Sequence, residues 1–156
     1  MDTPEAVTSP AAGNPAPTVR TGAAAPLVPM QMDPDELRAV DLKGELGCGF
    51  APSPQETPLL MAASFVDKAA TSQAAMKLGN QVVMLETQSK GGFDALTKGA
   101  RFVGPDGLFA NIVRASDEPM QENPHITMES PRYPALLVLS RDGTELSIDG
   151  FWECGP

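Results

Sequence analysis

Residues 135–154 read ALLVLSRDGTELSIDGFWEC, and this stretch decides the class of the fold. Its second half alternates in character from one residue to the next, which is typical of a β-strand with one buried face. The Asp142-Gly143 pair before it favours a tight hairpin turn, because both residue types tolerate the positive φ that such turns require. We therefore predict a hairpin of two strands, over residues 135–140 and 144–154. The second strand has an apolar or small face and a polar face: Leu146, Ile148, Gly150, Trp152 and Cys154 against Glu145, Ser147, Asp149 and Glu153.

The period of two continues upstream, where turn residues separate the runs. Gly79-Asn80 and the GPDG stretch at residues 104–107 are each suited to a tight turn between strands. A short helix is predicted over residues 34–40, with Asp33 as its N-cap and Pro34 at its first position. The run at residues 71–77 is short enough to suit a helix as well as a strand. The predicted upstream strands cover residues 42–50, 59–66, 75–78, 81–86, 100–103 and 108–114.

These seven or eight short strands, separated by turns, predict an all-β fold, a small antiparallel barrel or sandwich. The length of 156 residues suits one domain. The first 34 residues differ from the rest, since they hold seven of the sixteen prolines and only three β-branched apolar residues. Such a segment gains too little from burial to fold, and alternating Ala and Pro favour an extended chain. We therefore predict a disordered Pro/Ala-rich tether over residues 1–34 and a β-barrel-like domain over residues 35–156.

The formal charge of −9 at pH 7 argues against two classes of partner. Nucleic-acid binding needs a basic surface that displaces counterions, and docking on an anionic membrane face needs one too. The longest apolar runs, such as residues 59–63 and 135–139, are far shorter than the ~20 residues that span a bilayer as a helix. Because the tether stands at the N-terminus, one hypothesis is that it is lipid-anchored in the native chain. The alternative is an ordinary flexible terminus.

Cys48 and Cys154 lie in the first and the last predicted strand of the domain, each on the apolar face. If these two strands pair to close a barrel, the sulfurs meet in the seam and a disulfide forms. A disulfide persists only in an oxidising compartment, so this pairing predicts a periplasmic or outer-membrane-anchored protein. The alternative is a pair of buried free thiols that act as small hydrophobic residues.

Recognisable catalytic motifs are scarce in this chain. His125, the single histidine, lies in a polar loop over residues 117–134, and no nucleophile motif accompanies it. The chain has no phosphate-binding glycine loop, dinucleotide fingerprint or Gly-x-Ser-x-Gly turn. We therefore predict no catalytic residue, metal site or cofactor. The acidic residues of the first and last strands, if adjacent, would form either a cation site or a solvated face: Asp41, Glu45, Glu145, Asp149 and Glu153, with Lys43 among them.

The segment Thr97-Lys98-Gly99-Ala100-Arg101-Phe102 follows the Gly79-Asn80 hairpin, and the two cysteines stand near the ends of the domain. This order resembles the bacterial c-type lysozyme inhibitors, small envelope β-barrels often carried as lipoproteins, in which a Ser-Gly-Ala-Arg-Tyr motif follows a hairpin. Gly99, Ala100 and Arg101 match that motif, whereas Lys98 stands where the family has serine, and the family's downstream Trp-x-Lys-Gly segment has no counterpart. The resemblance implies that a loop residue enters the cleft of the enzyme, with Thr97 or Lys98 as the candidate.

We therefore expect a non-enzymatic binding domain of the bacterial envelope, with a lysozyme-type glycan hydrolase as its most concrete partner. Animal-type lysozymes are basic, and an acidic inhibitor would meet them faster through electrostatic steering. Phe151 lies on the polar face of the last strand, where an exposed aromatic ring can anchor a partner. Two other functions stay open: a structural or assembly factor of the envelope, and a small-ligand binder that uses the mouth or interior of a barrel. The predicted partner-binding residues are Thr97, Lys98, Arg101 and Phe151.

Overall fold

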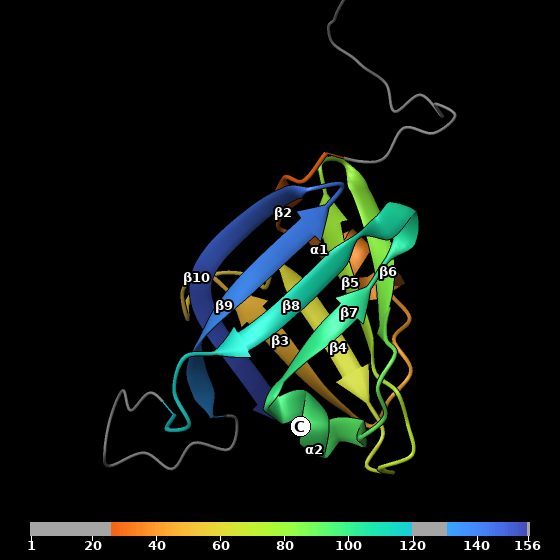
Figure 1. The fold of residues 1–156 in the computed structure, drawn as a ribbon, viewed down its shortest axis with the longest axis vertical. Coiled ribbons are helices and arrows are strands. Elements are labelled where there is room, and N and C mark those ends of the chain that lie inside the picture. Colours follow the sequence, from red (N-terminus) through yellow and green to blue (C-terminus); the bar gives the residue numbers. More distant parts are fainter. Residues whose placement is uncertain (1–25, 120–130, 156) are drawn as a thin grey trace, which may run out of the picture.

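Eight consecutive strands form a closed antiparallel barrel in the computed structural model, which describes residues 26–119 and 131–155 (Figure 1). Each of these strands pairs with the next along the chain, and the last pairs with the first. The predicted all-β class is confirmed, as a barrel and not a sandwich. The strands of the barrel are β3 (Leu46–Ala51), β4 (Leu60–Ser64), β5 (Gln73–Leu78), β6 (Gln81–Thr87), β7 (Gly99–Val103), β8 (Phe109–Arg114), β9 (Arg132–Arg141) and β10 (Thr144–Gly155).

The tight turns form where the sequence predicted them. Gly79 connects β5 to β6 with a φ of 60°, and Asp142 and Gly143 connect β9 to β10 with φ values of 52° and 81°. Between β7 and β8 the chain turns through a short 3-10 helix, Pro105–Gly107. Periodicity alone does not decide whether residues 71–77 form a helix or a strand. In the structure, the residues from Gln73 onward form β5, because β4 and β6 pair with its two edges.

β3 and β10 close the barrel, and a covalent bond joins them. Cys48 of β3 and Cys154 of β10 are direct partners in the strand register. They form a disulfide, with their Cα atoms 4.0 Å apart, and both side chains are buried. The predicted disulfide is therefore confirmed, and the alternative of two free thiols is wrong.

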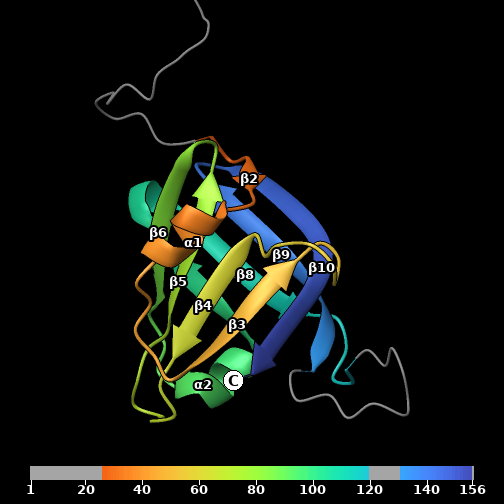
Figure 2. The ribbon, with the colours of Figure 1, turned by 180° about the vertical axis from the view of Figure 1, so that it is seen from behind.

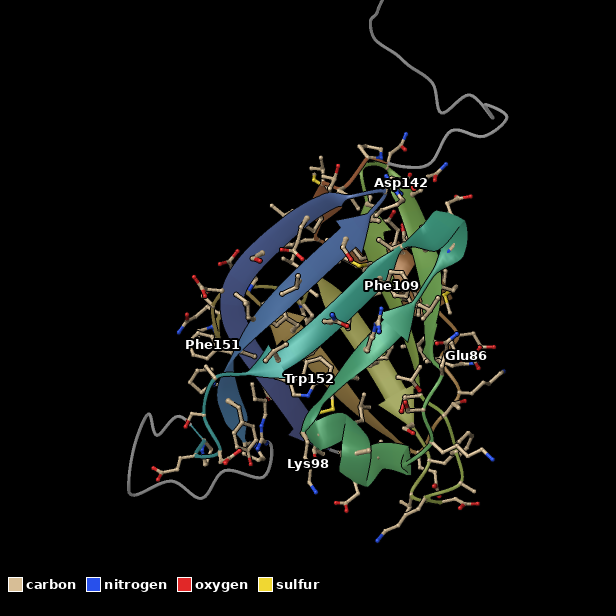
Figure 3. All side chains as sticks on the ribbon, in the orientation of Figure 1. Glu86, Lys98, Phe109, Asp142, Phe151 and Trp152 are labelled. Atoms are coloured by element: carbon tan, nitrogen blue, oxygen red, sulfur yellow. A yellow bond between two sulfur atoms is a disulfide. The ribbon has the colours of Figure 1, made fainter. Side chains whose placement is uncertain are left out.

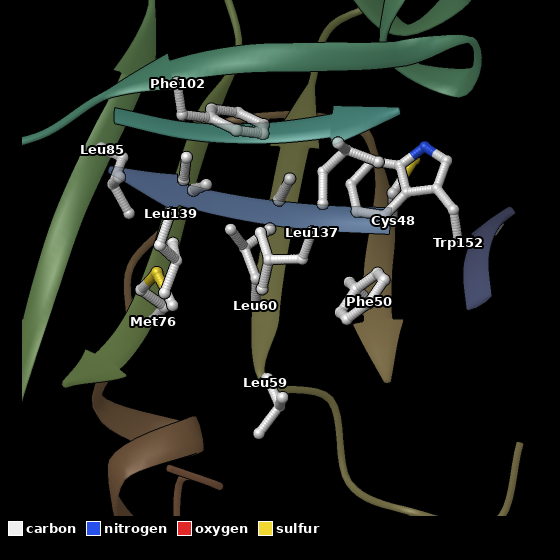
Figure 4. Packing of buried hydrophobic residues seen from close by; sticks show 14 of the residues in the cluster. Cys48, Phe50, Leu59, Leu60, Met76, Leu85, Phe102, Leu137, Leu139 and Trp152 are labelled. Atoms are coloured by element: carbon white, nitrogen blue, oxygen red, sulfur yellow. The ribbon is translucent and has the colours of Figure 1, made fainter. Parts of the chain in front are cut away.

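Side chains fill the interior of the barrel (Figure 4). Phe50, Phe102 and Trp152 are fully buried there, together with several leucines. A barrel of eight strands has an interior just wide enough to be filled by side chains or to hold one small ligand. Here the interior is a packed core. A hollow lies at one end of the barrel and a groove lies on its outside.

The packed domain includes residues that we expected in the tether. β2 (Pro29–Met30) pairs with the end of β5, beyond the part of β5 that pairs with β4, and Met32 is buried. Residues 26–34 are therefore placed against the barrel, while the rest of the expected tether, residues 1–25, lies outside the described residues. A two-residue strand forms through tertiary pairing and has no periodicity that a sequence analysis could detect.

The predicted short helix is present as α1 (Pro34–Ala39), on the outside of the barrel near β5 and β6 (Figure 2). Its N-terminus has a capping box: the Asp33 carboxylate accepts a hydrogen bond from the Glu36 amide (2.8 Å), and the Glu36 carboxylate accepts one from the Asp33 amide (2.9 Å). The same Glu36 carboxylate pairs with Lys77 Nζ of β5 at 3.0 Å. One glutamate thus caps the helix and attaches it to the sheet.

We expect the substitution Asp33→Ala to lower the free energy of unfolding by about 1 kcal/mol, because it removes the N-cap acceptor of α1. Asp35→Ala is the matched control, since Asp35 pairs with Arg38 on the exposed face of the same helix and exposed pairs contribute about 0–1 kcal/mol. Urea denaturation followed by circular dichroism would measure both. Equal losses in the two variants would show that charge near the helix, and not capping, sets its stability.

Candidate functional site

A second helix, α2 (Gly92–Thr97), lies across one end of the barrel (Figure 1). Gly92 allows it to approach the loop after β4: its φ is 64°, and a Cβ there would lie 2.4 Å from the carbonyl oxygen of Asp67. The Phe93 amide donates to the carbonyl oxygen of Phe65 (2.8 Å), which joins the helix to the same loop. On the barrel side, Trp152 Nε1 donates to the carbonyl oxygen of Leu96 at 2.9 Å. The helix is therefore fixed to the barrel from two sides.

The structure brings three of the four predicted partner-binding residues to this end. Thr97 is the last residue of α2, and its hydroxyl donates to the carbonyl oxygen of Asp94 at 2.7 Å. Lys98 is the C-cap residue and is exposed (Figure 3). Arg101 lies on β7, also exposed, with its guanidinium 4.4 Å from the centre of the Phe109 ring. The resemblance implied a loop position for Thr97 and Lys98, which belong to a helix end instead; Arg101 lies in a strand, as predicted.

Of these three side chains, Lys98 is the most available to a partner. Thr97 already uses its hydroxyl inside the helix, and Arg101 is stacked on an aromatic ring. Among residues 26–119 and 131–155, by contrast, Lys98 forms no ion pair. Its ammonium group can therefore meet an external carboxylate without first breaking an internal interaction.

A hollow of about 200 Å³ lies beside these residues, between α2, β7 and the segment after β6. Its inner wall is polar and already hydrogen-bonded: the Thr87 hydroxyl accepts from the Ser72 amide (2.8 Å) and donates to the carbonyl oxygen of Ser89 (3.1 Å). Lys90 and Arg101 stand at its border. Two basic side chains, Lys90 and Arg101, thus line a small hollow at this end of an acidic protein.

Phe151, the fourth predicted residue, belongs to a different surface. It lies on the outward face of β10, away from Lys98 (Figure 3). It lines a separate groove of about 360 Å³, formed by β3, β4, β10 and the loop over residues 52–58. The four predicted residues therefore form two surfaces and not one.

The acidic residues of the first and last strands do not come together as a single cluster. β3 begins only at Leu46, so Asp41 and Lys43 precede it, and these two form an ion pair with each other at 2.8 Å. β10 meets β3 only from Phe151 onward, which leaves the acidic residues of its first half without β3 neighbours. Across residues 26–119 and 131–155, no three His, Cys, Asp or Glu side chains are grouped so that they could hold a metal ion. His125 lies outside the described residues.

The groove beside Phe151 is the feature that the sequence analysis missed. Its floor is Gly47 and Gly49, outward positions of β3 that carry no side chain. Glycines at alternate positions of a strand are a signal, because glycine inside a strand often marks a close approach of another group.

Neither α-helix of the described residues has the length and apolar character needed to cross a membrane. Comparison of the chain with protein-family models, curated proteins and solved structures found no match. The functional conclusions below therefore rest on the two surfaces just described and on the resemblance noted in the sequence.

Proposed function

We propose that this chain is a non-enzymatic binding domain of the bacterial envelope that inhibits a lysozyme-type glycan hydrolase through the end of the barrel at which α2 lies. The observation that carries the proposal is Lys98, an exposed ammonium group without an ion pair among the described residues, held at the tip of a fixed helix. It stands in the segment that resembles the inhibitor motif.

The chemistry of the enzyme suits a lysine in this position. Glycoside hydrolases of this kind use two carboxyl groups that flank the bond they cleave. An ammonium group inserted between those carboxyl groups would form charge-assisted hydrogen bonds and occupy the place of the substrate. Basic enzymes of this class would also be drawn to a chain of net charge −9, which raises the rate of encounter.

Two further features support the envelope part of the proposal. The Cys48–Cys154 disulfide is of a kind that persists in oxidising compartments. Pro26, the first described residue, packs beside Gly79 in the turn between β5 and β6, at the opposite end of the barrel from α2 (Figure 1). A domain anchored through the residues before Pro26 would therefore present α2 and Lys98 away from its anchor.

We expect the protein to suppress turnover by a c-type lysozyme at near-stoichiometric ratio, and Lys98→Ala to weaken this inhibition by at least about 30-fold. That factor corresponds to about 2 kcal/mol, the lower bound for truncating one partner of a buried charge pair. A turnover assay on a cell-wall suspension, with inhibitor titrated from substoichiometric to excess, measures the inhibition constant.

Lys68→Ala is the matched control for this test. Lys68 is an exposed lysine of the loop after β4, and its removal changes the net charge by the same amount. It should change the inhibition constant less than about threefold, as a long-range charge effect does, and towards tighter inhibition, because the variant is more acidic and the enzyme is basic. Full enzyme activity in the presence of a large molar excess of the protein would contradict the proposal, and so would equal losses in the two lysine variants.

A further inference from the structure

The groove beside Phe151 has a floor of bare backbone and walls of apolar side chains. Gly47 and Gly49 of β3 form the floor. On the β10 side, Glu153 is beside Gly49 and Phe151 is beside Ala51; on the β4 side, Met61 is beside Gly49, and Pro58 of the loop completes the lining. Pro58 lies over Gly49, since a Cβ built there would be 3.3 Å from Pro58 Cγ, whereas no side chain covers Gly47. An incoming side chain can therefore lie on the backbone at Gly47, beside Pro58.

The loop that forms the far wall is held in place by hydrogen bonds around Glu56. The Ser53 hydroxyl donates to Glu56 Oε2 (2.9 Å), and Gln31 Nε2 donates to Glu56 Oε1 (3.3 Å). The Leu59 amide donates to the carbonyl oxygen of Phe50 (2.7 Å), which fixes the point where the loop returns to the barrel. The groove is therefore preformed, which lowers the entropy that binding would cost.

The strand pairing restricts what the groove can bind. β3 is paired on one edge with β4 and on the other with β10, so its backbone groups are occupied and an incoming peptide cannot add to the sheet as a strand. Recognition must come from the walls and from charge. A ligand that lies flat between an aromatic ring and a thioether needs a long apolar stem.

The charge at the groove is acidic. Glu56 and Glu153 line it against the single cation Arg132, whose Nε donates to Glu153 Oε1 at 2.9 Å. Two further carboxylates, those of Asp149 and Glu145, lie on the outward face of β10. The whole chain has a net charge of −9. Charge therefore favours a cationic occupant.

We propose that this groove binds an arginine side chain from an extended basic segment of another protein. The aliphatic stem of the arginine lies over Gly47 and beside Pro58. Its guanidinium stacks on the Phe151 ring near the Glu153 carboxylate, which it shares with Arg132. Arginine suits this arrangement better than lysine, because its planar head stacks on aromatic faces and binds carboxylates in a fixed geometry. This site is separate from the Lys98 end and does not depend on the proposed inhibition.

The test is an NMR titration of the full ¹⁵N-labelled chain with hexa-arginine, acetylated and amidated at its ends. We expect the amide signals of Gly47 and Gly49 to shift in a saturable way. Phe151→Ala should weaken binding by about tenfold through loss of the cation–π contact. Glu153→Gln should weaken it by about threefold, and hexalysine, which carries the same charge, should bind the unaltered chain about threefold more weakly.

Glu145→Gln and Lys98→Ala are the controls. Glu145 lies on the same face of β10, outside the groove, so Glu145→Gln changes the net charge by the same amount as Glu153→Gln but removes no groove carboxylate. Lys98→Ala should leave the affinity for hexa-arginine unchanged, which separates this site from the proposed inhibition. Equal losses in Glu145→Gln and Glu153→Gln, with none in Phe151→Ala, would overturn the proposal in favour of attraction by net charge alone. Hexa-arginine shifts that leave Gly47 and Gly49 unaffected would also overturn it.

Discussion

Replacement of both cysteines, Cys48→Ala with Cys154→Ala, should lower the free energy of unfolding by about 4 to 5 kcal/mol on the chain-entropy model. The two residues are 106 positions apart, so their bond closes nearly the whole domain into one loop and strongly restricts the unfolded chain. For a domain of this size the loss corresponds to a fall in Tm of roughly 15 °C. Alanine is the right replacement because both positions are buried, and serine would add an unpaired hydroxyl.

Guanidinium denaturation of the wild type, the wild type with reductant, and the double variant would measure this effect. Reductant should move the wild type to the stability of the double variant and should leave the variant itself unchanged. A loss below about 1 kcal/mol would mean that the disulfide restricts the unfolded chain little, contrary to the entropic account. A larger loss than expected would indicate that the seam does not close without the bond.

Trp152→Ala should lower the free energy of unfolding by about 3 to 5 kcal/mol, the usual range for truncating a large buried aromatic residue. Trp152 is fully buried and stands between the core and α2, where its indole nitrogen donates to the carbonyl oxygen of Leu96. The substitution therefore removes apolar contacts and also leaves that carbonyl without its donor. Urea denaturation followed by far-ultraviolet circular dichroism measures the change, because Trp152 is the single tryptophan and its fluorescence is lost.

Trp152→Phe separates the two contributions. Phenylalanine keeps most of the apolar contact but has no donor for the Leu96 carbonyl, so we expect a loss of about 1 to 3 kcal/mol from the unsatisfied group. The freed end of α2 should also become more sensitive to proteolysis than the rest of the barrel. A Trp152→Phe variant as stable as the wild type would show that the hydrogen bond contributes nothing to the attachment of α2.

Alternation, apolar runs and turn residues predicted the barrel strands, with errors at their ends: β3 begins at Leu46 and not at residue 42, and β9 begins at Arg132 and not at residue 135. Local chemistry was sufficient for the turns and for α1. Asp33 illustrates why: its capping partner lies three residues away, so the signal is contained within one turn of helix. The hairpin at Asp142 and Gly143 is equally local. The pairing of Cys48 with Cys154 required one further assumption, that the first and last strands meet, and closed barrels satisfy it because they leave no free edge.

The parts that were missed depend on tertiary contacts. α2 has six residues and begins at Gly92, and its N-cap residue is Gly91, which has no side chain to cap it, so neither periodicity nor capping marked it. Its position follows from contacts with Trp152 and with the loop after β4, far away in the sequence. For the same reason the sequence grouped Phe151 with Lys98 as partner-binding residues, although strand geometry places them on different surfaces.

The seam disulfide also determines how the domain would respond to mechanical load. A pull applied to the two ends of the chain passes from β3 to β10 through the sulfur–sulfur bond, so the residues between Cys48 and Cys154 carry no tension. The cysteines are 106 positions apart in the sequence, so roughly 350 to 380 Å of contour length is not stretched by the force. Only the segment before β3 and the last residues can be stretched. A stretched chain of this design would lose its N-terminal strand and helix while the barrel itself stayed shielded from the load.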